Sequence, residues 1–237
     1  HPLGLILAIC PWNFPLAIPL WKSAPALAYG NTVLLKPASP AIATASLLAE
    51  CATEILPESV FQVLPFSGSA AAELLDDQRI AAATFTGSTG VGVQVAARMA
   101  SRAAPAQAEM GGQNAAIVLE DANLDAVADA IVAGAMGYTG QKCTATRRVV
   151  ALAPIRAELE AKLAERVSAV KVGDPAADGV VAGPLISADA AEEFEAARGA
   201  ALADGASEIA QAGLPDGPGF MVAPTLHRQD DPAAEVN

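Results

Sequence analysis

The stretch IAAATFTGSTGVGVQVAARMASRA, residues 80–103, decides the fold. Its first eight residues, IAAATFTG, form an apolar run of strand length, and its last thirteen, VGVQVAARMASRA, are typical of a helix. Glycines and small hydroxyl residues join the two parts. A strand that leads through a short glycine-rich turn into a helix is the repeating unit of α/β proteins.

The same alternation extends toward the N-terminus. The predicted strands there are LGLILAIC (3–10), NTVLLKP (31–37) and SVFQVLP (59–65), and the predicted helices are 14–30, 39–56 and 69–77. We expect Pro19 and Pro25 to interrupt the first helix, and Ser39 to be the N-cap of the second with Pro40 at its first position. Alternating strands and helices predict an α/β fold with a parallel, doubly wound sheet.

The pattern changes near residue 109. Strands are predicted at 115–119 and 144–152, and helices at 123–140, 154–173 and 187–205, with an i,i+4 ion pair between Glu158 and Lys162. We therefore place one domain at 1–108 and a second at 109–237.

Composition excludes several classes of protein. Of 237 residues 53% are hydrophobic, so a core can form, and the net charge of −12 argues against partners such as nucleic acids or anionic membranes. No apolar run reaches about 18 residues. Three cysteines without CxxC spacing suit a reduced, cytoplasmic protein, and two histidines do not make a zinc site. The chain lacks an initiator methionine and ends without a cap, so we expect a fragment of a longer protein.

Cys143 is a candidate nucleophile. It lies in YTGQKCTATRR, where Lys142, Arg147 and Arg148 supply positive charge that favours the reactive thiolate. The alternative is a buried structural cysteine, since free cysteines are among the most buried residues. We interpret the other two cysteines, both in apolar runs, as structural.

Two further residues are candidates for a reaction centre. Glu109 precedes two glycines in AEMGGQN, which leave its carboxylate uncrowded; a solvated glutamate at a domain junction is the alternative. Asn13 lies in PWNFP, where prolines and aromatics fix the backbone and hold its amide as a rigid donor; an Asx-turn is the alternative.

The turn FTGSTGVG is a candidate phosphate site, because it opens a helix whose N-terminus attracts anions. Its glycines, Gly87, Gly90 and Gly92, do not have G-x-G-x-x-G spacing, so an ordinary βα turn is equally compatible. Lys36 ends a predicted strand, where ligands bind in doubly wound sheets; it could also be an ordinary surface lysine.

The motifs PWNFP, LKPAS, FTGSTGVG, EMGGQN and GQKC occur in this order. Asn13 and Lys36 are 23 residues apart, and Glu109 and Cys143 are 34 apart. In this order and spacing the chain resembles the aldehyde dehydrogenase superfamily over all 237 residues, about half of a usual member.

The resemblance implies a Rossmann-like cofactor domain, incomplete at its N-terminus, and part of a second α/β catalytic domain. By this resemblance Cys143 attacks the aldehyde, Asn13 holds the oxyanion and Glu109 activates water. The implied cofactor contacts are Trp12, Lys36, Ser39, Gly87, Ser88 and Gly92. Lys22 and Arg148 also match family positions, and we give them a structural role.

The resemblance implies NAD- or NADP-dependent oxidation of a small-molecule aldehyde, with a lean toward semialdehydes, in a parent homodimer or homotetramer. The isolated chain would be inactive. A CoA-acylating member is the first alternative, although such members usually lack the base at the Glu109 position; a non-catalytic structural fragment is the second. NAD-preferring members often carry KPxE. This chain has KPAS, with Ser39 at the glutamate position, so NADP is expected to be accepted at least as well as NAD.

Overall fold

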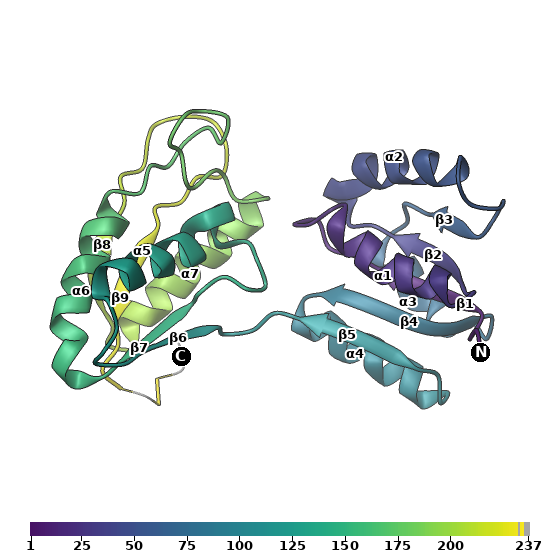
Figure 1. The fold of residues 1–237 in the computed structure, drawn as a ribbon, viewed down its shortest axis with the longest axis horizontal. Coiled ribbons are helices and arrows are strands. Elements are labelled where there is room, and N and C mark those ends of the chain that lie inside the picture. Colours follow the sequence, from purple (N-terminus) through teal and green to yellow (C-terminus); the bar gives the residue numbers. More distant parts are fainter. Residues whose placement is uncertain (232, 235–237) are drawn as a thin grey trace. The chain divides into compact units, whose positions relative to one another are not determined.

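The protein is described here by a computed structural model, which covers residues 1–231 and 233–234. The chain divides into two compact units, His1–Gly111 and Gly112–Asn237 (Figure 1). The division lies three residues beyond the boundary expected from sequence. Glu109 therefore belongs to the last strand of the first unit.

The first unit is built on a parallel five-stranded sheet with the order β3-β2-β1-β4-β5. The strands are β1 (Leu5–Ile9), β2 (Thr32–Lys36), β3 (Phe61–Val63), β4 (Ile80–Gly87) and β5 (Ala106–Met110). The chain runs outward from β1 to β3 and then crosses back to place β4 on the other side of β1. This reversal confirms the doubly wound α/β fold, and it creates a switch point between β1 and β4, where such sheets bind ligands.

Helices cover both faces of this sheet (Figure 1). They are α1 (Ala17–Ala28), α2 (Ile42–Thr53), α3 (Gly68–Leu74) and α4 (Thr89–Ser101). Neighbouring residues of β1 point to opposite cores: Leu7 packs in the cluster with Val95 and Met99 of α4, and Ala8 in the cluster with Ile18 of α1. A strand buried on both faces is apolar throughout, which is why the strands were readable as continuous hydrophobic runs.

A buried asparagine ties the start of the chain to α1. Asn31 is 8% exposed, and its side-chain oxygen accepts hydrogen bonds from the N–H groups of Leu3 at 2.6 Å and Gly4 at 3.1 Å. Its amide donates to the carbonyl oxygen of Ala26 at 2.9 Å. One side chain thus satisfies three backbone groups at the edge of the core.

Two expectations about helices were wrong. The first helix is continuous through Pro19 and Pro25. Pro19 lies in the first turn, where its missing N–H group would have no intrahelical partner anyway. Ser39 is not an N-cap: it is the first residue of a short 3₁₀ turn, η1 (Ser39–Ala41), and neither η1 nor α2 has a side-chain cap hydrogen bond.

The second unit contains two small sheets. The parallel pair is β6 (Ala115–Val118) and β7 (Arg148–Ala151), and the antiparallel pair is β8 (Ser207–Gln211) and β9 (Thr225–Arg228). Its helices are α5 (Leu124–Met136), the turn η2 (Gly137–Gly140), α6 (Ala153–Ser168) and α7 (Ala188–Ala203). The predicted helix 123–140 therefore ends earlier, at Met136, and strand β8 was not predicted.

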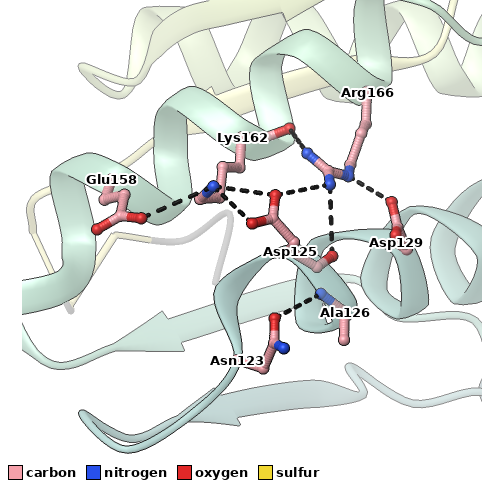
Figure 2. Close-up of polar contacts among 7 residues, drawn as sticks. All are labelled: Asn123, Asp125, Ala126, Asp129, Glu158, Lys162 and Arg166. Atoms are coloured by element: carbon pink, nitrogen blue, oxygen red, sulfur yellow. Dashed lines mark hydrogen bonds and ion pairs between the residues drawn. The ribbon is translucent and has the colours of Figure 1, made fainter.

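Ion pairs join α5 to α6 on the outer surface of this unit (Figure 2). Lys162 contacts Asp125 at 2.9 Å and Glu158 at 3.7 Å, which confirms the predicted i,i+4 pair. Arg166 contacts Asp125 and Asp129. Hydrogen bonds from Lys162 and then Arg166 lower the pKa of Asp125 from its ordinary value. These solvated pairs align two helices whose apolar sides meet in the core of Val118, Ala128, Ile131, Leu159 and Leu163.

Candidate active site

The candidate cofactor residues follow the carboxyl ends of neighbouring strands. Trp12 and Asn13 come after β1, Lys36 is the last residue of β2, and Gly87 and Ser88 lie at the end of β4. These three strands are adjacent and parallel, so their carboxyl ends share one edge of the sheet. Sequence reasoning named each residue separately, and the topology of the first unit accounts for why they gather.

Two glycines near this edge pack closely against neighbouring side chains. A Cβ atom on Gly87 would lie 2.5 Å from the Phe85 ring, and one on Gly92 would lie 2.6 Å from the Met110 side chain. The first turn of α4 contains no acidic residue, and the N-cap residue Ser88 makes no side-chain cap hydrogen bond. At the N-terminus of α4 the backbone N–H groups are therefore not covered by a capping side chain or by an acidic residue. Such N–H groups are suited to bind the pyrophosphate of a dinucleotide.

Lys36 and Ser39 lie where the chain leaves β2. Lys36 is partly buried, and burial lowers the pKa of its ammonium group from the ordinary value for lysine. Ser39 is exposed and, as described above, does not cap a helix. An exposed small hydroxyl three residues after a lysine leaves room for an anionic group beside the cation.

Glu109 lies on β5, an edge strand, with its side chain exposed. Two residues earlier on the same face, Gln107 is paired in register with Thr84 of β4. The Lys22 ammonium of α1 donates to the Thr84 hydroxyl at 2.8 Å and to the Gln107 side-chain oxygen at 3.4 Å. Burial lowers the pKa of Lys22, while the nearby Cys10 and Glu109 act in the opposite direction. Lys22 is thus a partly buried cation held on the sheet face that carries Glu109.

Cys143 lies on a turn between η2 and β7 in the second unit. Its side chain is exposed, and its sulfur is not in a disulfide bond. The turn is closed by a hydrogen bond from the N–H of Ala145 to the carbonyl oxygen of Lys142, at 3.2 Å. An accessible thiol on an ordered turn is suited to nucleophilic attack, whereas the alternative of a buried structural cysteine does not describe it.

The other two cysteines differ from each other. Cys10 is buried, as expected, and burial raises the pKa of its thiol to about 12, so it stays protonated near neutral pH. Cys51 lies on α2 and is exposed, so the prediction that it is buried was wrong. Leu47, one turn earlier on the same face of α2, is exposed as well.

Among the described residues, no group of three or more His, Cys, Asp or Glu side chains is arranged to hold a metal ion. In the same part of the chain, no helix combines the length and hydrophobicity needed to cross a membrane.

The first unit holds Asn13 and the candidate cofactor contacts at one edge of its sheet, and Glu109 on β5. The second unit holds Cys143. Sequence reasoning missed Asn114, whose side chain donates a hydrogen bond to the carbonyl oxygen of Cys143 at 2.6 Å. The GGQN motif was visible, but its partner lies 29 residues away.

Known proteins are similar to this chain in sequence and in fold. The family model described as "Aldehyde dehydrogenase family" matches residues 1–236. The alpha-ketoglutaric semialdehyde dehydrogenase of Bacillus subtilis is 43% identical over 78% of this chain and 38% of its own length. The NADP(+) succinate-semialdehyde dehydrogenase of Mycobacterium leprae is 38% identical over 95% of this chain and 50% of its own.

Solved structures agree. The Mycobacterium tuberculosis aldehyde dehydrogenase complexed with NAD+ superposes with a TM-score of 0.95 at 35% identity, over all of this chain and 50% of that one. An NADP-dependent enzyme of E. coli gives 0.93 at 33% identity, again with 50% of its chain covered. The chain spans about half the length of the relatives it matches, or less. From its sequence and its fold, the chain belongs to the aldehyde dehydrogenase family.

Proposed function

We propose that the protein carrying this chain oxidises an aldehyde to the carboxylate, with NAD or NADP as the acceptor. The observation that carries the proposal is the exposed, unbridged thiol of Cys143 on an ordered turn of the second unit. Membership of the aldehyde dehydrogenase family supports the same reaction class.

In the proposed reaction the Cys143 sulfur attacks the carbonyl carbon of the aldehyde and forms a thiohemiacetal. The Asn13 amide and the Cys143 backbone N–H donate hydrogen bonds to the resulting oxyanion. A nicotinamide cofactor held by the residues at the carboxyl ends of β1, β2 and β4 would supply the hydride acceptor, and loss of the hydride would leave this carbon as a thioester. Glu109 then takes a proton from water, whose oxygen attacks the thioester carbon; the carboxylate leaves and the thiol is restored.

The substrate is proposed to be a semialdehyde. This rests on relatives whose names specify alpha-ketoglutaric and succinate semialdehydes as what those proteins act on. An anionic far end on such a substrate would need a cation in its pocket. The active protein is proposed to be a homodimer or homotetramer.

The cofactor is proposed to be NADP at least as readily as NAD. Ser39 is exposed and follows Lys36 by three residues, so a 2′-phosphate bound here would meet a cation and a small hydroxyl group rather than a carboxylate. Relatives and neighbours include proteins described with NADP and with NAD+, which supports a nicotinamide cofactor and leaves its type to this local chemistry.

The test uses the natural-length protein that carries this chain. Formation of NADPH or NADH is followed with a panel of semialdehydes, and the product is identified as carboxylate or, with CoA added, as acyl-CoA. Cys143→Ala should abolish turnover. Cys51→Ala is the matched control, because it removes another exposed thiol and should leave the rate unchanged. Turnover that survives Cys143→Ala would refute the proposed function.

A further inference from the structure

The turn that carries Cys143 is held by hydrogen bonds from one side chain, that of Asn114, which immediately precedes β6. The Asn114 amide nitrogen donates hydrogen bonds to the carbonyl oxygen of Cys143 at 2.6 Å and to that of Ala145 at 3.0 Å. Both hydrogens of one NH₂ group are therefore used on the same turn. Since the two acceptors lie two residues apart, the amide fixes the orientation of the turn as well as its position.

The backbone of Asn114 extends the same contact. Its carbonyl oxygen accepts hydrogen bonds from the N–H groups of Arg147 at 2.9 Å and Arg148 at 3.1 Å. Asn114 thus makes four hydrogen bonds to the segment from Cys143 to Arg148, two through its side chain and two through its carbonyl group. This is the point at which the parallel pair of β6 and β7 begins, so the turn is joined to the sheet at its C-terminal side.

The N-terminal side of the turn is anchored separately. The Thr139 hydroxyl oxygen accepts a hydrogen bond from the N–H of Gly183 at 2.9 Å, and the Gln141 side-chain oxygen accepts one from the N–H of Ile186 at 2.9 Å. Cys143 therefore lies between two anchors. The peptide N–H of Cys143, the proposed oxyanion donor, is part of the segment that they hold.

The backbone in this segment is under strain. Tyr138 and Thr139 have φ values of 62° and 56°, in the left-handed region that residues other than glycine seldom adopt, least of all a β-branched threonine. Strained conformations persist only where surrounding contacts enforce them, and they gather at functional sites. The Asn114 amide holds the turn that follows these two residues in the chain.

We propose that Asn114 is a positioning residue for the nucleophile: its amide sets the turn so that the sulfur and the backbone N–H of Cys143 meet the aldehyde in the reactive geometry. The inference rests on the proposed function, in which Cys143 is that nucleophile. It assigns Asn114 no contact with the substrate. Removing the amide should slow attack on the aldehyde without removing the thiol.

The experiment isolates this step in the natural-length protein. In a Glu109→Gln background, hydrolysis of the thioester should be slow, so each active site releases one NAD(P)H in a rapid burst. The burst has a rate constant, which reports the formation of the thioester, and an amplitude, which reports the number of competent sites. Cys143→Ala in the same background serves as the blank.

Three substitutions of Asn114 grade the effect. Asn114→Leu keeps the approximate volume and removes both donors, Asn114→Asp turns an oxygen toward two carbonyl oxygens, and Asn114→Ser keeps one short donor. The burst rate constant should fall about 10- to 100-fold in the Leu and Asp variants, because a misplacement of about 1 Å can cost about 10² in rate, and less in the Ser variant. The amplitude should be preserved. Gln113→Leu is the matched control, since Gln113 has an exposed side chain and contacts Arg148 through its carbonyl oxygen.

The possible results separate the two proposals. A lower amplitude with an unchanged rate constant would show that Asn114 serves folding alone, and an unchanged burst would show that the amide is not needed; either overturns the inference and leaves the proposed function standing. A Glu109→Gln protein that forms NAD(P)H without Cys143 would instead overturn the proposed function. If the Leu and Asp variants do not fold, the Ser variant decides, because it retains a donor and its rate constant should still fall below that of the control.

Discussion

A methyl group added at Gly92 would test how closely α4 packs on the sheet of the first unit. The new Cβ atom would lie 2.6 Å from the Met110 Cγ and Sδ atoms and 3.1 Å from the Phe85 ring. Gly90, two residues earlier in the same helix, has no neighbouring atom of the described residues within 4 Å of its built Cβ. Gly90→Ala and Gly92→Ala are therefore one substitution in one helix, with and without a steric clash.

The expected difference follows from two terms. Alanine in place of glycine favours a helix by about 0.5–1 kcal/mol, and both variants share this gain. Overpacking typically costs about 1–3 kcal/mol and falls on Gly92→Ala alone. Met110 is 37% exposed and can swing aside, whereas Phe85 is 3% exposed and cannot. We expect the free energy of unfolding of Gly92→Ala to lie about 1–3 kcal/mol below that of Gly90→Ala, toward the lower end of this range if Met110 moves.

Urea denaturation followed by circular dichroism would measure this difference. In a chain of this length, about 1 kcal/mol corresponds to roughly 2–4 °C in melting temperature. Repeating the pair in a Met110→Ala background should remove part of the penalty, because the nearest colliding atoms are gone. Equal stability of Gly90→Ala and Gly92→Ala in the unsubstituted background would refute the packing described here.

Four other predictions concern individual side chains. Glu109→Gln should keep the burst of NAD(P)H but reduce steady-state turnover about 10²- to 10⁴-fold, measured by stopped-flow and steady-state absorbance; unchanged turnover would remove Glu109 from its proposed role. Ser39→Glu should shift the NADP-to-NAD ratio of kcat/KM toward NAD, since like charges about 4 Å apart cost on the order of 4 kcal/mol at an effective dielectric of 20; a wild type that already prefers NAD tenfold, with no further shift in the variant, would contradict this. Because Lys36 is protonated only below its pKa, and burial lowers that pKa, the preference for NADP should weaken with rising pH before an exposed lysine would lose its charge. Asn31→Leu should lower the free energy of unfolding by about 2–3 kcal/mol in urea denaturation, because buried backbone groups lose their partners; a change below about 0.5 kcal/mol would show that water replaces the amide.

Much of the first unit was predictable because its strands are buried on both faces. Their apolar runs appear in sequence order, and short connections lead from β2, β3 and β4 to the helical elements that follow them. Strand β5 escaped prediction for the opposite reason. Its sequence, AQAEM, is at the edge of the sheet, and most of its residues are exposed, so selection for a hydrophobic core leaves little trace there. Glu109 was consequently expected to begin the second domain, whereas it lies within a strand of the first unit.

Local rules also failed where packing overrides them. Pro25 lies inside α1, although proline in a helix removes a hydrogen bond and usually bends the chain. Ser39 followed by proline is a common helix start, yet the chain enters α2 through a 3₁₀ turn instead. The failed cap has a consequence for function: the Ser39 hydroxyl is not engaged as an N-cap of the following helix, and this supports the proposed role of Ser39 in the choice between NAD and NADP.

The candidate site also has one part that the sequence predicts and one part that it does not. The cofactor residues follow strand ends, and topology alone brings strand ends together, so a sequence that predicts the topology also predicts the grouping. The hydrogen bonds from Asn114 to the turn of Cys143 do not follow from the topology in this way. Gln113 and Asn114 are neighbours with the same amide chemistry, but the amide bonded to the turn is that of Asn114, whereas Gln113 is exposed and contacts Arg148 through its backbone carbonyl oxygen. A shift of one residue would exchange their roles. The motif GGQN therefore predicts that a side-chain amide lies near the nucleophile. The register of β6 against β7 determines whether that amide belongs to Gln113 or to Asn114.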